Sequence, residues 1–190
     1  AGGVDAGGGG GGAPAKKAKT GGGVVNTKRL TSDLKKMRKA AAASDGAFSV
    51  ELLDDDDLTR WQVQLREFDP ACALAKDLVK YKKKHGVDTL TMRFYFPDDY
   101  PLAAPFVHIY TPKLTGMYVF SGGLCVNVLM QGWAAGITPE ALMLQIRMLL
   151  TEGQVRINNV NKIEYWSEKE ARSGFKMALS AHARDKNFAD

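Results

Sequence analysis

Cys125 is the residue of this sequence whose type and setting best suit covalent chemistry. It follows a glycine pair within TGMYVFSGGLCVNVL, the segment from Thr115 to Leu129. A thiolate is a strong nucleophile and a good leaving group, so a cysteine can accept an acyl group and pass it on. Cysteine is also among the most buried residue types, so a role in packing is the alternative.

The residues around Cys125 favour the reactive role. The preceding TGMYVFSGG contains too much glycine and too little alternation to continue a sheet, whereas LCVNVL suits a short ordered element. Cys125 therefore stands where a loop becomes ordered structure, and loops on rigid scaffolds often carry reactive groups. The other cysteine, Cys72, lies in an Ala-rich helical stretch within residues 69–86, where we expect it to pack.

Acyl transfer through Cys125 does not require a base beside it in the sequence. A free thiol has a pKa of about 8.5, so only a few per cent is ionised at neutral pH. Exchange of an acyl group between two thioesters is nearly balanced in energy and needs no general base. A protease-like Cys–His pair is the alternative, and it would require His85, His108 or His182 to fold against the thiol.

The elements that must position Cys125 are predicted to form an α+β fold with strands and helices segregated along the chain. Apolar residues Leu30, Leu34, Met37 and Ala41 recur at helical spacing among basic residues, which predicts an amphipathic first helix from Thr27. Period-two alternation then predicts a meander of four antiparallel strands. These strands fall within residues 47–53, 60–68, 87–96 and 105–110.

Two helices are predicted after Cys125, and their ends are marked by capping residues. Thr138 is placed as an N-cap, and Gly153 follows the last residue of the first of these helices. The second begins after Ser167, which can form a capping box with Glu170. The fold is therefore expected to end in helices that pack behind the cysteine segment.

The basic charge of the chain is concentrated near its N-terminus. The net charge is +5, but residues 1–39 hold nine Lys or Arg against two Asp, so the remainder is slightly acidic. Residues 1–26 are rich in Gly and Lys and cannot bury enough apolar surface to offset the entropy of ordering. We expect a flexible arm there, followed by one domain at 27–190, in which the acidic run DDDD at 54–57 is a solvated turn.

Composition also bounds the setting in which the chain works. No run of 18 or more apolar residues occurs, so we expect no membrane segment. The N-terminus lacks the pattern of a secretory signal and the chain has only two cysteines, which favours the cytoplasm, the nucleus or both. No CxxC or HxxxH spacing occurs, so we expect no metal.

From about Thr27 to Phe188 the chain resembles the ubiquitin-conjugating enzyme family, and most closely its Q-type branch. The resemblance rests on the basic first helix, the four-strand meander, and FPDDYPLAAP, which is similar to the Tyr-Pro-x-x-Pro-Pro turn of the family. It rests also on the cysteine in GGLCVNVL and on Trp133, which follows it by eight residues and is expected to pack. Together these features imply a ubiquitin-conjugating-enzyme-like fold.

The resemblance implies a reaction and its partners. An activating enzyme would hand ubiquitin, or a ubiquitin-like protein, to Cys125 as a thioester. The activating enzyme would use the ATP, so this chain would need no cofactor. Cys125 would then transfer the modifier to a lysine or a hydroxyl of a protein substrate, with the help of a ubiquitin ligase.

The sequence departs from most of the family just before the cysteine. Other members carry His-Pro-Asn there, and the Asn is thought to steady the oxyanion, whereas this chain has Thr-Gly-Met at 115–117. The Q-type branch also lacks the triplet. Tyr118 is the first substitute, as a donor to the oxyanion or a wall of the acceptor groove, with loop packing as its alternative. Asn127 is a second candidate.

The resemblance also implies a role for His182, on the expected inner face of the last helix. Its segment AHARDKNF is similar to the end of the Q-type domain that packs near the thiol. A histidine there would take a proton from an incoming amine or hydroxyl. A satisfied core histidine is the alternative. The acidic residue that guides an acceptor lysine in many relatives has no counterpart in VRINNVNK, which leaves the acceptor open.

Two surfaces are expected to meet partner enzymes. By the resemblance, the positions that meet ligases are Leu102 and, in a second loop, Ala135 and Gly136. The basic face of the first helix would meet an acidic activating enzyme, with association rates that depend on salt. Its residues are Arg29, Lys35, Lys36 and Lys39.

Two rival functions are open from the sequence. A non-catalytic scaffold or ubiquitin-binding module of the same fold would keep Cys125 buried. A nucleic-acid binder would use the Lys-rich arm and show steep salt dependence, but no motif that interleaves basic and aromatic residues supports it.

Overall fold

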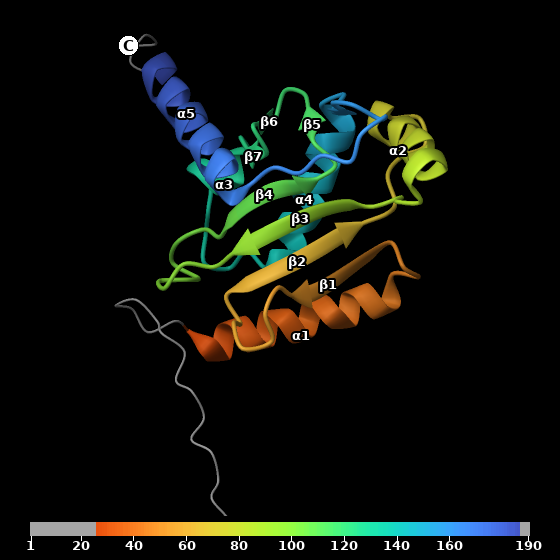
Figure 1. The fold of residues 1–190 in the computed structure, drawn as a ribbon. Helices are drawn as coiled ribbons and strands as arrows, with labels where there is room; N and C mark the ends of the chain where they lie inside the picture. The colour runs from red at the N-terminus through yellow and green to blue at the C-terminus, as the bar shows by residue number, and fades with distance from the viewer. Residues whose placement is uncertain (1–25, 187–190) are drawn as a thin grey trace, which may run out of the picture.

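The computed structural model describes residues 26–186, with side chains through Ala181 (Figure 1). The predicted arm therefore lies outside the described residues except for Asn26, whose side chain accepts a hydrogen bond from the Arg29 backbone and caps the first helix. The elements in chain order are α1 (Thr27–Ala43), β1 (Phe48–Leu52), β2 (Arg60–Leu65), α2 (Ala73–His85), β3 (Leu90–Tyr95), β4 (Phe106–Thr111), β5 (Leu114–Thr115), β6 (Val119–Phe120), β7 (Gly123–Leu124), α3 (Asn127–Met130), α4 (Pro139–Glu152), β8 (Arg156–Ile157) and α5 (Glu168–Lys186).

An antiparallel sheet with the strand order β1-β2-β3-β4-β7-β6 forms the centre of the domain. Its first four strands are the predicted meander. Val63 of β2 pairs with Val50 of β1 and with Met92 of β3, and all three are buried, as the alternation requires. The α+β fold with an N-terminal helix, an antiparallel sheet and C-terminal helices is confirmed.

The sheet continues further than the sequence predicted. The segment before Cys125 was expected not to continue a sheet, yet β6 and β7 join it, and β7 pairs with β4 through Gly123 and His108. The same stretch contributes β5, which pairs with β8. These strands are two residues each, too short to show a period-two pattern among glycines. The expectation was wrong for that reason.

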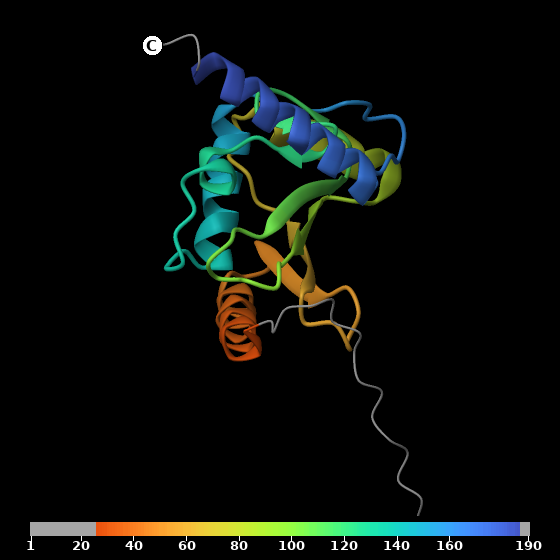
Figure 2. The ribbon, with the colours of Figure 1, turned by 90° about the vertical axis from the view of Figure 1, so that its left-hand side faces the viewer.

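The helices cover both faces of the sheet (Figures 1 and 2). α4 lies on one face and shares the hydrophobic core with α1 and the strands, through fully buried residues such as Ile146 and Leu30. α5 lies on the opposite face, where it contacts β4, β6 and β7 and buries Ala171 and Ala178. The strands next to Cys125 are therefore fixed by packing from α5.

The predicted helix boundaries are confirmed by their capping contacts. Thr138 accepts a hydrogen bond at its side chain from the Ala141 backbone, 3.2 Å away. The Ser167 hydroxyl accepts from the Glu170 backbone while the Glu170 carboxylate accepts from the Ser167 backbone, which is a capping box. Gly86, with φ +72°, ends α2 in the left-handed conformation.

The described residues also answer two questions about composition. None of the helices within residues 26–186 is long and apolar enough to cross a bilayer. The same stretch contains no cluster of three or more His, Cys, Asp or Glu side chains placed to hold a metal ion. The acidic run at 54–57 forms a turn in which Asp54 and Asp57 accept hydrogen bonds from nearby backbone groups.

Candidate active site

Cys125 is held between the end of β7 and the start of α3. Its backbone N–H donates to the Tyr118 carbonyl at 2.9 Å, and its neighbours Leu124 and Val126 are buried. The Cys125 side chain itself is half-buried. The chain thus anchors both neighbours in the core and leaves the thiol between them at the surface, which is the loop-to-ordered junction that the sequence predicted.

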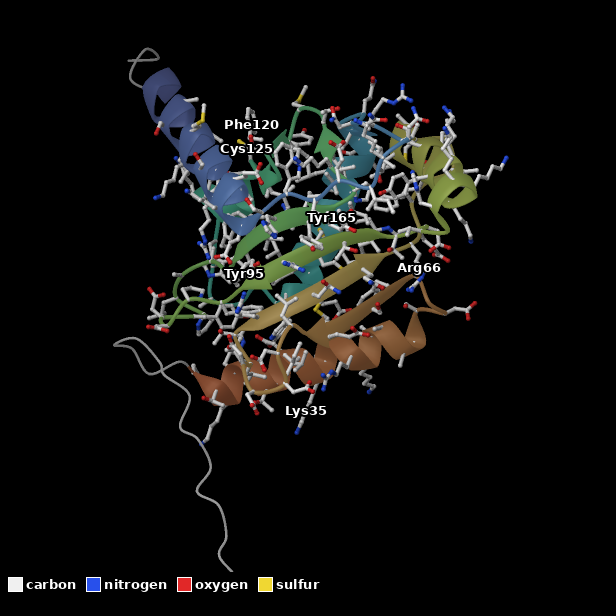
Figure 3. All side chains as sticks on the ribbon, viewed as in Figure 1. Lys35, Arg66, Tyr95, Phe120, Cys125 and Tyr165 are labelled. Atoms are coloured by element: carbon white, nitrogen blue, oxygen red, sulfur yellow. The ribbon has the colours of Figure 1, made fainter. Side chains whose placement is uncertain are left out.

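The glycine pair before Cys125 is required by close packing against the C-terminal part of the chain. A Cβ on Gly122, which has φ +86°, would lie 2.6 Å from the Trp166 ring. A Cβ on Gly123 would lie 2.6 Å from the Ala171 carbonyl oxygen on α5. Only glycine permits these approaches without displacing α5. The pair therefore seats the cysteine strand on the last helix, as Figure 3 shows for Cys125 and α5.

A cavity of about 420 Å³ opens beside the thiol, between the cysteine segment and α4. Burial raises the pKa of Cys125, so the thiol is less ionised at neutral pH than a free cysteine. The thiol also lies 3.5 Å from the Met130 sulfur. The residues that line the cavity are all uncharged: Tyr118, Cys125, Val126, Asn127, Met130, Gln131, Gln145 and Leu149.

Tyr118 and Asn127, the two predicted substitutes for the missing Asn, both line this cavity. The Tyr118 ring also packs against the end of α4, because a Cβ on Gly153 would lie 2.6 Å from its Cδ2 atom. Tyr118 therefore packs and faces the cavity at once. Sequence reasoning missed Gln131 and Gln145, which line the same cavity, because nothing in the linear sequence brings α4 beside Cys125.

The histidines give a mixed result. His85 contacts the Val160 carbonyl at 3.2 Å, and His108 is fully buried, so neither lines the cavity of Cys125. Burial, with the nearby Arg93, lowers the pKa of His108 to about 4. A Cys–His pair with either of them is therefore wrong. His182 lies in the last turns of α5, but its side chain falls outside the described residues.

Cys72 occupies a different position from the one expected. It is not inside a helix but is the N-cap of α2, where its sulfur accepts a hydrogen bond from the Ala75 backbone at 3.3 Å. It also packs against the hydrophobic core. The predicted packing role is confirmed, and the cap adds a reason for a polarisable side chain there.

The predicted ligase-facing positions lie on two exposed loops that α1 ties together. Leu102 is 79% exposed, and Ala135 and Gly136 are exposed in the second loop. The Trp133 indole N–H donates to the Pro101 carbonyl at 2.8 Å, which joins the loops directly. Trp133 is half-buried against the core, so its predicted packing role is confirmed.

Arg29 does not share the outward basic face predicted for it. Its guanidinium pairs with the buried Asp33 at 2.6 Å and donates to the carbonyls of Ala135, at 2.9 Å, and Ile137, at 3.3 Å. A buried carboxylate needs a cation or donors, which turns Arg29 inward. Lys35 remains on the outer side of α1, on the opposite side of the molecule from Cys125 (Figure 3). Lys36 and Lys39 are likewise exposed.

Comparisons with known proteins agree with this geometry. Residues 29–182 match the family model described as ubiquitin-conjugating enzyme. Ubiquitin-conjugating enzyme E2 Q1 of Homo sapiens is 34% identical over 159 residues, which cover 82% of this chain and 37% of that protein. The chain therefore spans little more than a third of the length of E2 Q1. A human Q-like protein 1 of the ubiquitin-conjugating enzymes is 33% identical over 155 residues, which cover 80% of this chain and 93% of that protein.

Solved structures show the same fold. Human ubiquitin-conjugating enzyme E2 G1 superposes with a TM-score of 0.50 at 25% identity, over 67% of this chain and 98% of that chain. An E2 domain from Toxoplasma gondii gives a TM-score of 0.51 at 16% identity, over 81% of this chain and 91% of that chain, a likeness of fold alone. Fold, cysteine setting and sequence matches together show that the chain belongs to the ubiquitin-conjugating enzyme family, with Q-type members among its relatives.

Proposed function

We propose that this chain conjugates ubiquitin, or a ubiquitin-like protein, through a thioester on Cys125. The observation that carries the proposal is the half-buried thiol at the end of β7, which opens into a cavity large enough for an extended peptide tail and its acceptor. The family assignment supplies the reaction class. The partners are an activating enzyme, the modifier, a ubiquitin ligase and a protein substrate.

The raised pKa of Cys125 suits a carrier more than a hydrolase. A thiol that stays largely protonated until it meets an activated acyl group has little side reactivity, and exchange between two thioesters needs only its transient ionisation. Burial also keeps water from the thioester once it has formed. The same burial makes charging by the activating enzyme faster as the pH rises.

The acceptor is a lysine or a hydroxyl. No charged side chain lines the described cavity, so it contains no carboxylate that would select a lysine ammonium group. In this proposal Tyr118 lines the acceptor path, and His182, which α5 carries toward the site, receives the acceptor's proton. A neutral histidine is suited to that role near pH 7.

Partner enzymes dock away from the thiol. Leu102, Ala135 and Gly136 form the ligase-facing surface, and the exposed Lys35, Lys36 and Lys39 on α1 meet the activating enzyme. Charge attraction would raise the rate of encounter with that enzyme at low salt. Two cysteines kept as thiols fit a reducing compartment, the cytoplasm or the nucleus.

The proposal is tested by charging the purified chain with ubiquitin, an activating enzyme and ATP, followed by a non-reducing gel. A band that dithiothreitol removes is expected for the parent protein and for Cys72→Ser, which keeps an N-cap side chain at α2. Cys125→Ser should give no band or a thiol-resistant ester. A folded protein that gives no band with any ubiquitin-like modifier would favour the non-catalytic scaffold instead.

A further inference from the structure

The cavity beside Cys125 holds three neutral hydrogen-bond donors from three different elements. They are the Tyr118 hydroxyl, the Asn127 amide at the start of α3 and the Gln145 amide on α4. None of these three side-chain groups makes a hydrogen bond to another described residue. A donor in a partly dry cavity with no internal partner is available to a bound molecule.

The transfer step creates a need for such a donor. The acceptor N–H or O–H attacks the carbonyl carbon of the Cys125 thioester, a C–N or C–O bond forms, and the carbonyl π pair moves onto oxygen. When the oxyanion collapses, the C–S bond breaks, the pair leaves on sulfur, and the acceptor's proton passes to the thiolate or to solvent. A preorganised donor to the oxyanion is often the largest single contribution to such catalysis.

The backbone next to the thiol cannot supply this donor. The Cys125 N–H already donates to the Tyr118 carbonyl at 2.9 Å, inside the β7 turn. The His-Pro-Asn position of the family is occupied here by residues 115–117, and none of these lines the cavity. The donor must therefore come from a side chain that faces the cavity.

Gln145 is the best placed of the three side chains. α4 is a 14-residue helix with a side-chain cap at Thr138, and the fully buried Leu142 and Ile146 fix its orientation. Gln145 therefore projects from a rigid wall across the cavity from the cysteine segment. The Asn127 amide nitrogen lies close to Gly132, 3.0 Å from where a Cβ would be, and the Tyr118 ring is packed on Gly153. Both of these are held to the side.

We infer that the Gln145 side-chain amide donates a hydrogen bond to the oxyanion formed during transfer from Cys125, and is thus a catalytic residue. The inference rests on the proposed function. It assigns the chemical task of the absent Asn to the opposite wall of the cavity. Tyr118 and His182 are then left to act on the acceptor, so the two kinds of residue differ in what they contact.

The test is single-turnover discharge of purified, ubiquitin-charged protein with each of three small nucleophiles: lysine, glycerol and hydroxylamine. Gln145→Ala is expected to charge normally but to discharge about 100-fold more slowly. The slowing should be similar for all three nucleophiles, because the donor acts on the carbonyl and not on the acceptor. Gln145→Glu has the same shape but no amide donor, so it should be at least as slow as the alanine variant.

Controls and contrary results separate this inference from the proposed function. Gln62→Glu, on β2 away from the cavity, should discharge at the parent rate. If charging forms a thioester but Gln145→Glu discharges at the parent rate, Gln145 merely lines the wall and the inference is wrong. Slowing with lysine alone would assign Gln145 to the acceptor, which also overturns it. Absence of any thioester on the parent protein would instead overturn the proposed function.

Discussion

The Tyr100 hydroxyl donates a 2.7 Å hydrogen bond to the carboxylate of Asp33, and both residues are almost fully buried. The same carboxylate pairs with Arg29, whose guanidinium reaches the loop of Ala135. One buried acid on α1 thus joins the helix to both exposed loops that we propose meet ligases. Burial and the Asp33 charge raise the pKa of Tyr100 well above its ordinary value.

Tyr100→Phe is expected to destabilise the domain by about 1–2 kcal/mol, because it leaves the buried Asp33 with one donor fewer. The free energy of unfolding, from urea titration at pH 7, measures this loss. The matched control is Tyr165→Phe, at an exposed tyrosine. Equal stability of the two variants would show that the Tyr100–Asp33 bond contributes nothing in solution.

His108 should make the domain sensitive to acid. Its ring nitrogens have no partner among the described residues and its pKa in the folded state is about 4, below the value of about 6.5 expected in the unfolded chain. Because the unfolded state binds the extra proton, stability falls as the pH decreases from about 6.5 to about 4, by roughly 3 kcal/mol. Unfolding experiments across this range should show that loss.

A His108→Phe variant serves as the control for this acid sensitivity. Phenylalanine suits an environment made by the Tyr95 and Phe106 rings, whose centroids lie 5.6 Å and 5.8 Å from the His108 ring. The variant should therefore keep its fold and lose most of the pH dependence between 6.5 and 4. An unchanged acid profile would mean that another group titrates in this window.

Alkylation of Cys125 should report its raised pKa directly. Because burial favours the neutral thiol, the rate of reaction with iodoacetamide is expected to keep rising with pH beyond 9, the ordinary value for a cysteine. Mass spectrometry of the Cys125 peptide gives the rate at each pH. A rate that levels off below pH 8 would contradict the burial-driven shift.

Gly174→Ala should loosen α5 from the cysteine segment. Alanine is the better helix former, by about 1 kcal/mol. A Cβ at 174, however, would run into the Phe120 carbonyl on β6. We expect a net loss of stability and at least a tenfold loss of discharge from Cys125, because α5 and the cysteine strand would separate. Ser173→Ala, an exposed neighbour, should leave both unchanged, and equal behaviour of the two variants would exclude this coupling.

The sequence carried much of this fold because its signals are local. Alternation placed β1 to β4, and Thr138, Ser167 and Gly86 marked helix ends through contacts within three or four residues. It could not place β6 and β7, whose pairing depends on glycines that pack against α5. The cysteine was found from its loop setting and from the family resemblance, both of which act near it in the chain.

The remaining parts of the site depend on contacts between distant segments. Gln145 follows Cys125 by 20 residues, and only the packing of α4 brings it to the cavity. Arg29 appeared to belong to a basic outer face because its partners lie elsewhere in the fold. One signal was available: Asp33 follows Leu30 by three residues and precedes Met37 by four, which puts it on the apolar side of α1. A charge there predicts a buried partner.

The most direct test of the central claim is intact-protein mass spectrometry after charging with ubiquitin, an activating enzyme and ATP, followed by peptide mapping of the attachment point. The account predicts a mass increase of one ubiquitin, carried on Cys125 and removed by dithiothreitol. A folded protein that gains no modifier, or one that carries it on Cys72 instead, would contradict the assignment of Cys125 as the acyl carrier.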